Sequence, residues 1–236
     1  MASYELLYWS VPFRGQFVRA ILAHAGVEWT EWDEPAIAEL MDANVVDMPV
    51  PFMGPPVLID SESGFAVSQM PAIVFYLGEK LDLLPKTPEL RALTMKVVND
   101  ANDVIDELTL NGGQAMWTEE RWQDFIPRLC KWMTFWEVLG TKHGLTADDG
   151  YLLGGSAPGI ADIVTATLWT TIADRFDRIE KMLAETAPHT LALSRRVSSH
   201  PALVKLNQQT RSAYGDDYAG GQIGASMASV LTSRNG

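Results

Sequence analysis

The chain has 236 residues, with 18 basic and 30 acidic side chains and a formal net charge of −12. Nucleic acids and anionic membranes both need a basic binding surface, so this composition argues against either as the main partner. The single cysteine, Cys130, excludes an intrachain disulfide and a site with several cysteine ligands. The first residues lack the basic and apolar regions of a signal peptide, and no apolar run reaches the ~18 residues of a membrane span. We therefore expect a cytoplasmic protein.

The first third of the chain alternates short apolar runs with segments of helical spacing. Residues 4–9 are apolar and aromatic, as in a buried strand. Residues 16–25 carry apolar side chains three and four positions apart, which predicts a helix that ends before Gly26. The same criteria predict strands at 27–32, 55–60 and 65–67, and helices at 35–44 and 71–81. The predicted order is strand, helix, strand, helix, strand, strand, helix.

Residues 81–90 contain two prolines, and they are the expected boundary between two domains. The chain beyond them shows only helical spacing. Long apolar stripes predict helices over 90–108 and 122–140, the second starting at Thr118, and shorter ones follow at 160–173, 179–184, 191–197 and 202–211. Gly159 and Asp162 are the expected N-cap and N3 residues of the first of these shorter helices. Residues 215–236 are rich in glycine, serine and alanine, so we expect a loosely ordered tail.

Three sets of motifs occur in order along this layout. They are YWSVPFRGQFVRAIL at 8–22, then PPVLID with QMPAIVFYLGEKLDLLP at 55–85, and LLGGSAPGIADI with RRVSSHPAL at 152–203. In this order and spacing they resemble the cytosolic glutathione transferase superfamily, and in particular a bacterial-type member of unclear class. The resemblance implies a thioredoxin-like α/β domain with a mixed four-stranded sheet at 1–82, which would bind glutathione. It also implies an all-helical domain at 89–214, a flexible tail at 215–236 and a homodimer.

The chemistry of this superfamily needs a hydroxyl that stabilises the thiolate of glutathione, because an unperturbed thiol is mostly protonated at neutral pH. Tyr8 matches that donor at the end of the first strand, and it lies eleven residues before Arg19, as in the tyrosine-type classes. Without the resemblance, Tyr8 would be interpreted as a core residue of a buried strand. Ser10 is the alternative donor, although Val11 separates it from Pro12, where serine-type classes place the serine directly before the proline.

Glutathione itself would bind to backbone and polar groups that follow the strands. Pro56 corresponds to the cis-proline of the superfamily, and Pro55 stands where a backbone N–H and C=O pair with the cysteinyl part. Since proline has no N–H, only the carbonyl of Pro55 can pair. Gln69 matches the residue that holds the γ-glutamyl ammonium, and Met70 replaces a serine, leaving its backbone N–H at a helix N-terminus. Ser68 is a substitute hydroxyl, and helix capping is the competing role for Ser68 and Gln69.

Cations are scarce near this expected site. Residues 1–80 carry three basic and eleven acidic side chains, a net charge of −8. No lysine or arginine lies between Trp29 and Gly54, where the superfamily usually has one for the glycine carboxylate. Arg14, Trp9 or a group from the second domain must serve that carboxylate, or the peptide binds weakly. An ordinary solvated loop cation is the competing interpretation of Arg14. We expect Arg19 to brace the first helix.

The second substrate is expected between the domains, with Val11, Met116 and Trp117 as the acceptor site and Phe125 and Trp132 as further lining. A Trp and Met stripe at helical spacing is more often core. We predict an enzyme that adds the glutathione thiol to a small hydrophobic electrophile, with glutathione as co-substrate and no metal. Another glutathione-dependent reaction (disulfide reduction, dehalogenation, ether cleavage or isomerisation) and a non-catalytic binding module are the alternatives.

Overall fold

The computed structural model describes residues 3–232, and its first part is built on a four-stranded sheet. The elements of this part are β1 (Tyr4–Leu7), α1 (Phe13–His24), β2 (Trp29–Glu31), α2 (Glu34–Asp42), a 3₁₀ turn (Val45–Asp47), β3 (Val57–Asp60), β4 (Ala66–Ser68) and α3 (Met70–Lys80). The strand order is β2-β1-β3-β4, with β1 parallel to β2 and antiparallel to β3, and β3 antiparallel to β4. The predicted fold class, a mixed α/β sheet followed by helices, is confirmed.

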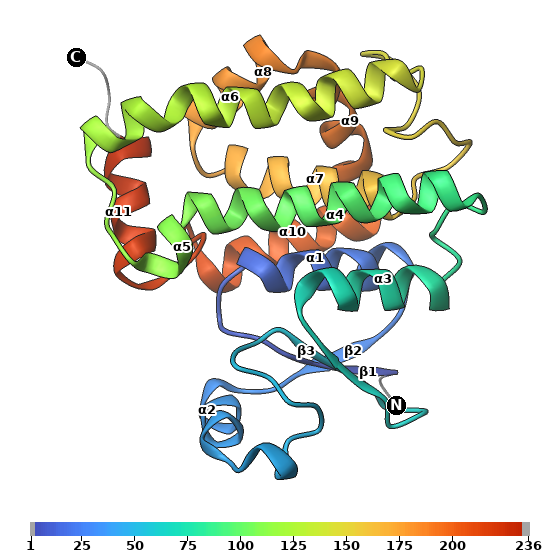
Figure 1. The fold of residues 1–236 in the computed structure, drawn as a ribbon, viewed down its shortest axis with the longest axis vertical. Coiled ribbons are helices and arrows are strands. Elements are labelled where there is room, and N and C mark those ends of the chain that lie inside the picture. The colour runs from blue at the N-terminus through green and yellow to red at the C-terminus, as the bar shows by residue number, and fades with distance from the viewer. Residues whose placement is uncertain (1–2, 233–236) are drawn as a thin grey trace.

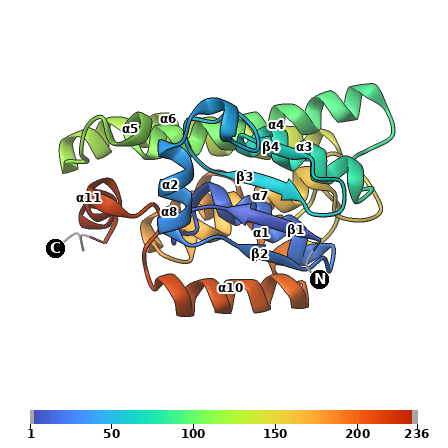
Figure 2. The ribbon, with the colours of Figure 1, turned by 90° about the horizontal axis from the view of Figure 1, so that it is seen from below.

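The two faces of the sheet are covered by different helices (Figures 1 and 2). Side chains alternate across a strand, so Leu6 of β1 joins the large core under α1 and α3. Leu7 points to the other face, where it packs with Val57 of β3 and Ile37 of α2. Each strand of the centre of the sheet is therefore buried on both faces, and the functional groups can only gather at the ends of the strands.

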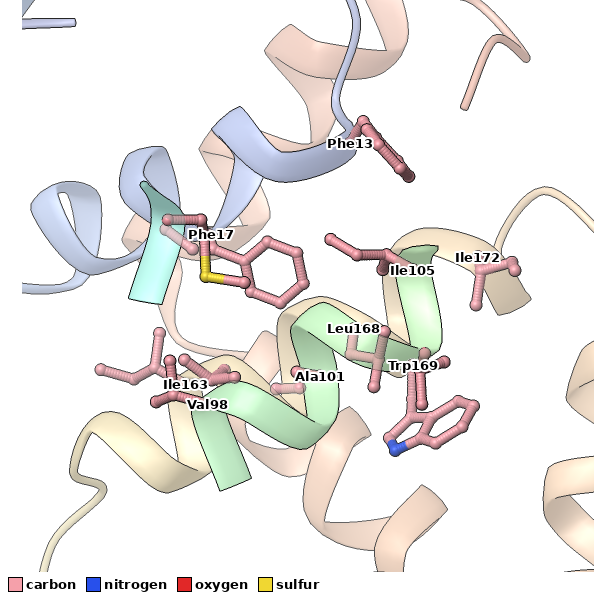
Figure 3. Packing of buried hydrophobic residues seen from close by; sticks show 14 of the residues in the cluster. Phe13, Phe17, Val98, Ala101, Ile105, Ile163, Leu168, Trp169 and Ile172 are labelled. Carbon is pink, nitrogen blue, oxygen red and sulfur yellow. The ribbon is translucent and has the colours of Figure 1, made fainter. Parts of the chain in front are cut away.

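The rest of the chain is helical. Its helices are α4 (Pro88–Leu108), α5 (Leu110–Gly113), α6 (Glu119–Lys142), α7 (Ile160–Ala173), α8 (Asp177–Thr186), α9 (Pro188–Ser198), α10 (Pro201–Tyr214) and α11 (Gly221–Leu231). Every residue of α7 is buried, and this helix packs against α1, α4 and α9. Phe17 of α1, Ala101 of α4 and Leu168 of α7 lie in one buried cluster (Figure 3). The predicted boundary at 81–90 covers the connection between α3 and α4 and the first three residues of α4. The shared core spans this boundary, so the division into two domains stays a prediction.

The expected starts of α6 and α7 are confirmed. Thr118 accepts a hydrogen bond on its hydroxyl from the backbone N–H of Arg121, as an N-cap does. At α7 the Asp162 carboxylate accepts the N–H of Gly159 at 2.9 Å and also the N–H of Leu152 at 2.7 Å. Asp162 thus fixes both the start of α7 and the loop that precedes it.

The prediction of a loosely ordered tail is wrong over the described part of 215–236. Residues 221–231 form α11, in which Met227, Val230 and Leu231 are buried. From Ile223 onward the apolar side chains of this helix are spaced three and four positions apart. The many small residues between them give the segment the composition of a disordered tail, which is why composition alone did not predict the helix. Residues 233–236 lie outside the described part of the chain. No described helix is both long and apolar enough to cross a membrane.

Candidate active site

One cross-strand row places the predicted site residues at a single edge of the sheet. Leu7 pairs with Val57, and Val57 pairs with Ser68. Tyr8 directly follows the first residue of this row and Gln69 directly follows the last. Because β1 and β4 both end at this edge, Tyr8 and Gln69 leave the sheet on the same side.

The loop before β3 reaches the same edge. The peptide bond between Pro55 and Pro56 is cis, which confirms the conformation expected for Pro56. Val57, which follows it, is the first residue of β3 and faces Leu7 across the ladder. Pro55 lies two residues before Val57, so its carbonyl precedes the start of β3 at the same edge of the sheet as Tyr8. Its contact with glutathione stays a prediction.

Tyr8 is buried beside the N-terminus of α1. Its hydroxyl oxygen accepts a hydrogen bond from the backbone N–H of Arg14 at 2.9 Å, and only 4% of the residue is exposed. Burial raises the pKa of Tyr8 to about 12, although the charges of Arg14 and Arg19 and the N–H of Arg14 oppose the rise. The hydroxyl is therefore protonated at neutral pH. Since the bond from Arg14 uses the oxygen as acceptor, the proton is left to donate to another group.

The ring of Tyr8 lies directly against the backbone of α1 at Gly15. A β-carbon at that position would stand 2.3 Å from Cδ1 of Tyr8, far inside contact distance. Gly15 is buried and helical, so its role here is space and not backbone freedom. The absence of a side chain at Gly15 thus allows the tyrosine to lie flat on the first turn of α1.

Arg14 reaches away from the sheet to α4. Its Nη2 lies 3.1 Å from a carboxylate oxygen of Asp106, and its Nε donates to Asn102 at 3.4 Å. The guanidinium carbon also lies 4.7 Å from the centre of the Phe13 ring. Arg14 therefore links the start of α1 to α4. In its predicted role, the Arg14 guanidinium would have to bind a glutathione carboxylate and Asp106 at the same time.

Arg19 braces the loop between β1 and α1, as expected. Its side chain is 3% exposed and donates to both carboxylate oxygens of Glu31, at 2.8 and 2.6 Å. It also donates to the carbonyl of Val11 at 2.9 Å. Despite the burial of Glu31, this guanidinium lowers the pKa of the carboxylate. Arg19 thus ties α1 to β2 and fixes the turn that follows Tyr8.

Ser10, the alternative donor, faces a different helix. Its backbone N–H donates to Glu34 of α2 at 2.9 Å, and hydrogen bonds from Ser10 lower the pKa of that carboxylate. A neighbouring carboxylate disfavours a thiolate electrostatically, whereas Arg14 near Tyr8 favours one. The surroundings of the two hydroxyls therefore favour Tyr8.

The residues before α3 expose backbone donors. Gln69 is exposed and has φ of 74°, a conformation that is strained for a residue other than glycine. It makes no side-chain hydrogen bond to cap α3, so the capping role is not observed for Gln69. Met70 is 1% exposed and part of the core, which leaves its backbone N–H as its available group. The N-terminal N–H groups of a helix have no partner within the helix itself, so the start of α3 suits an anion.

Two tryptophans of the predicted site, Trp9 and Trp117, pack in hydrophobic clusters. Trp9 packs in the cluster between the sheet and α2, beside Phe52. Trp117 is 5% exposed, donates its indole N–H to the carbonyl of Leu108 at 2.8 Å, and packs against Trp122 and Phe125. Trp117 is thus a core residue, as the competing interpretation has it.

The other residues of the expected acceptor site are also engaged locally. The carbonyl of Met116 accepts a hydrogen bond from Arg121 at 2.9 Å. Trp132 donates its indole N–H to Glu107 at 3.0 Å. Val11 lies against Gly220, where a β-carbon would stand 3.0 Å from its Cγ1. No described contact joins Val11 to Met116 or Trp117, and the acceptor site stays a prediction.

Sequence reasoning missed the segment that runs from α10 to α11, residues 215–220, which we call the strap. Tyr218 of the strap is 4% exposed, its carbonyl accepts the N–H of Phe13 at 3.3 Å, and its ring meets the Phe13 ring edge-on at 5.6 Å. Burial raises the pKa of Tyr218 above its usual range, and its hydroxyl lies within electrostatic reach of Tyr8 and Arg14. The strap therefore packs against the start of α1, beside the N-terminal turn that holds the Tyr8 hydroxyl.

Within residues 3–232 no group of three or more histidine, cysteine or acidic side chains is placed to hold a metal ion. Cys130 lies half-buried on α6.

Comparison with known proteins gives a consistent result over most of the chain. Residues 93–230 match the family model described as glutathione S-transferase, C-terminal domain. A Dictyostelium discoideum protein provisionally named glutathione S-transferase alpha-3 is 27% identical over 165 residues, 69% of this chain and 73% of that protein. Hematopoietic prostaglandin D synthase of Gallus gallus is 25% identical over 86% of this chain and 94% of its own. The structure of NaGST-2 superposes with a TM-score of 0.71 and 26% identity, over 88% of this chain and 97% of the other.

Proposed function

The chain belongs to the glutathione S-transferase family, and from this premise we propose that it uses Tyr8 to ionise the thiol of glutathione for attack on a small hydrophobic electrophile. The observation that carries the proposal is the state of the Tyr8 hydroxyl. It is buried, protonated at neutral pH, and held at the sheet edge by an N–H donated to its oxygen.

Such a hydroxyl would donate to the sulfur of glutathione and favour the thiolate over the thiol. A hydrogen bond to a charged acceptor is shorter and stronger than one to a neutral acceptor, so the donor selects the ionised form. Arg14 adds positive charge from the same side, and the buried setting keeps this charge less screened than in water. The attack then forms a carbon–sulfur bond, while the leaving group departs with the electron pair of the bond that breaks.

The peptide part of glutathione would lie along the sheet edge. We propose that the carbonyl of Pro55 pairs with the cysteinyl N–H, and that Gln69 holds the γ-glutamyl ammonium. The N-terminal N–H groups of α3, including that of Met70, would receive the γ-glutamyl carboxylate. The position of Gln69 directly after Ser68, in the cross-strand row that starts at Leu7, supports this arrangement. Ser68, Trp9 and Arg14 remain proposed contacts.

Two alternative functions, a non-catalytic binding module and another glutathione-dependent reaction, are also to be tested. Arg14 is paired with Asp106, and Pro55 offers no N–H, so weak binding of glutathione would leave a non-catalytic binding module. The chain is also similar to a prostaglandin D synthase, so another glutathione-dependent reaction, such as an isomerisation, stays an alternative to conjugation. Both alternatives use the same sheet edge and differ in what they do with the thiol.

The deciding experiment has two steps. The first is retention on immobilised glutathione with release by free glutathione, together with calorimetry at millimolar glutathione. Absence of both signals would refute the two enzymatic functions and leave the binding module. The second step replaces Tyr8 by phenylalanine and measures kcat/KM with a chloronitrobenzene-type acceptor.

We expect Tyr8→Phe to lower kcat/KM by about tenfold or more, because a hydrogen bond to a charged group contributes ~1.5–3 kcal/mol. Ser10→Ala is the matched control and should keep kcat/KM within about threefold of that of the unchanged protein, since the Ser10 hydroxyl is hydrogen-bonded to Glu34 of α2 and is not proposed to contact the thiol. If Ser10→Ala lowers kcat/KM by about tenfold or more and Tyr8→Phe stays within about threefold, Ser10 and not Tyr8 ionises the thiol.

We also propose a homodimer in the cytoplasm. Exposed apolar side chains on the sheet part support an interface, with Met53 at 93%, Val46 at 89% and Phe65 at 48% exposure. Light scattering after size-exclusion chromatography tests the homodimer, because a measured mass of 26.0 kDa would show a monomer. Fractionation of the source cells tests the second.

A further inference from the structure

A cavity of about 450 Å³ lies on the helical part, away from the edge of the sheet that carries Tyr8. It is open to solvent and is lined by residues of α1, α7, α9 and α10 and of the segment after α7. Three arginines, Arg175, Arg195 and Arg211, line it together with a single acid, Asp174. Most of the remaining lining is hydroxyl and amide side chains, and Val204 is its one aliphatic residue. In a chain of net charge −12, such a concentration of positive charge is distinctive. We call it the arginine cavity.

Arg175, at its inner wall, makes no ion pair with a described residue. Its Nε donates to the carbonyl of Asp217 at 2.9 Å and its Nη1 to the carbonyl of Thr171 at 2.9 Å. Its Nη2 is buried and has no hydrogen-bond partner within the described chain. Burial lowers the pKa of this guanidinium, and the charge of Arg211 lowers it further. Native proteins seldom leave a buried charged donor unpaired, because its lost hydration is not replaced.

The two outer arginines are paired with exposed carboxylates that a ligand can replace. Arg211 meets Asp216 of the strap at 2.7 Å, with side chains 49% and 83% exposed. Arg195 pairs with Glu180, and both of those side chains are about half exposed. Ion pairs of this kind contribute little to stability, so a better-placed anion can displace them at small cost.

The hydroxyl groups give the site a second kind of donor. Thr170 and Ser198 lie 3.1 Å apart, oxygen to oxygen, on facing helices of the cavity. A hydroxyl can turn its proton toward a new acceptor, whereas the planar guanidinium offers two parallel N–H groups to one oxyanion. The volume also fits a metabolite and not a macromolecule.

We propose that the arginine cavity binds a small dianion, whose charge lies on a phosphate or on two carboxylates, through Arg211 and Arg195 at its mouth and Arg175 behind them. The ligand displaces Asp216 from Arg211 and brings an oxyanion to the unpaired side of Arg175. None of the residues that line the arginine cavity is proposed to bind glutathione, so the titrations below test this inference separately from the proposed function.

The test is calorimetric titration of the full chain with inorganic phosphate, and separately with succinate, at constant ionic strength set with sodium chloride. A saturable signal with phosphate alone assigns the phosphate chemistry, and one with succinate alone assigns the dicarboxylate. We expect Arg211→Gln to weaken the binding by about tenfold or more, as the loss of a charge-assisted contact does. Arg128→Gln is the matched control, because it removes an equal charge from an exposed ion pair on α6, and its affinity should stay unchanged.

Two results would overturn the proposal. One is the absence of any saturable signal with either anion at millimolar concentration. The other is an equal loss of affinity in Arg211→Gln and Arg128→Gln, which would show a response to net charge alone. Arg175→Lys, which keeps a charge and a donor, tests the inner wall and should bind more weakly than the unchanged protein. Thermal unfolding of each variant without ligand identifies any loss that comes from misfolding, and in that case the Arg195→Gln variant decides.

Discussion

Replacing Gly15 by alanine changes only one methyl group, yet the structure predicts a large effect. In an ordinary helix this replacement is favourable by up to about 1 kcal/mol. Here the new β-carbon would stand 2.3 Å from Cδ1 and 2.7 Å from Cγ of Tyr8. Carbon atoms meet at ~3.5–4.0 Å, so the ring or the first turn of α1 must move by roughly 1 Å. Both partners are buried, which leaves no open space into which they can move.

We expect the free energy of unfolding to fall by about 1–3 kcal/mol, the usual cost of overpacking. The displacement also separates the Tyr8 hydroxyl from the N–H of Arg14, now 2.9 Å away. On the proposed function, a misplacement of about 1 Å lowers kcat/KM by about a hundredfold. Urea unfolding followed by tryptophan fluorescence measures the first quantity, and turnover of a chloronitrobenzene-type acceptor measures the second.

Gly224→Ala is the matched control. Gly224 lies inside α11, and its β-carbon would meet atoms of Ala219 only at 3.6 Å or beyond, an ordinary contact. Helix propensity should make that variant equal to or slightly more stable than the unchanged protein. The steric reasoning is refuted if Gly15→Ala unfolds at the same urea concentration as Gly224→Ala. A stable Gly15→Ala variant with full activity would also count against a role for the position of Tyr8.

Three further predictions concern charged groups. Tyr76→Phe removes the hydroxyl that donates to buried Asp60 at 2.6 Å, and it should lower the free energy of unfolding by about 1–2 kcal/mol at pH 7. That hydrogen bond is the main cause that lowers the pKa of Asp60, so the stabilisation belongs to the ionised carboxylate and is lost as the pH falls below its ordinary pKa of 3.8. Urea unfolding of both proteins between pH 3 and 7 checks that the difference shrinks in acid. Arg19→Gln, measured in the same way at pH 7, should cost about 1.5–3 kcal/mol, because it removes the charge-assisted hydrogen bonds to Glu31; a cost as small as that of Arg128→Gln would contradict the bracing role. Asp106→Asn should change stability by less than about 1 kcal/mol and lower KM for glutathione by freeing Arg14, and a raised KM would show that Asp106 positions Arg14 for the ligand.

Periodicity and motif order were sufficient for the sheet and for the long helices, because each of these elements buries a regular stripe. The start of α6 at Thr118 and the role of Asp162 also followed from local hydrogen-bonding chemistry. Boundaries were less accurate. For example, α1 begins at Phe13 and not at Gln16, because the backbone N–H of Gln16 already bonds to the carbonyl of Pro12 at 2.8 Å and closes an earlier turn.

The partners of the site residues could not be predicted, since they come from distant parts of the chain. Nothing near Arg14 in the sequence indicates Asp106, which is brought to it by α4. The indole of Trp117 was placed in the acceptor site by analogy, but its N–H satisfies the carbonyl of Leu108 and the ring fills the core. Gly15 gave no signal either, because a glycine in a helical segment is ordinarily only a weak helix former.

The strap has a consequence for the biosynthesis of this protein. Phe13 and Tyr218 touch each other from nearly opposite ends of the chain, and Val11 rests on Gly220. A ribosome therefore releases the first strand and helix long before the residues that cover them exist. Until residues 215–220 emerge, the ring of Phe13 lacks its contact with Tyr218, and Val11 lacks its contact with Gly220. A chain that stops before residue 215 would therefore carry every predicted catalytic group and lack the contacts that Tyr218 and Gly220 make with Phe13 and Val11.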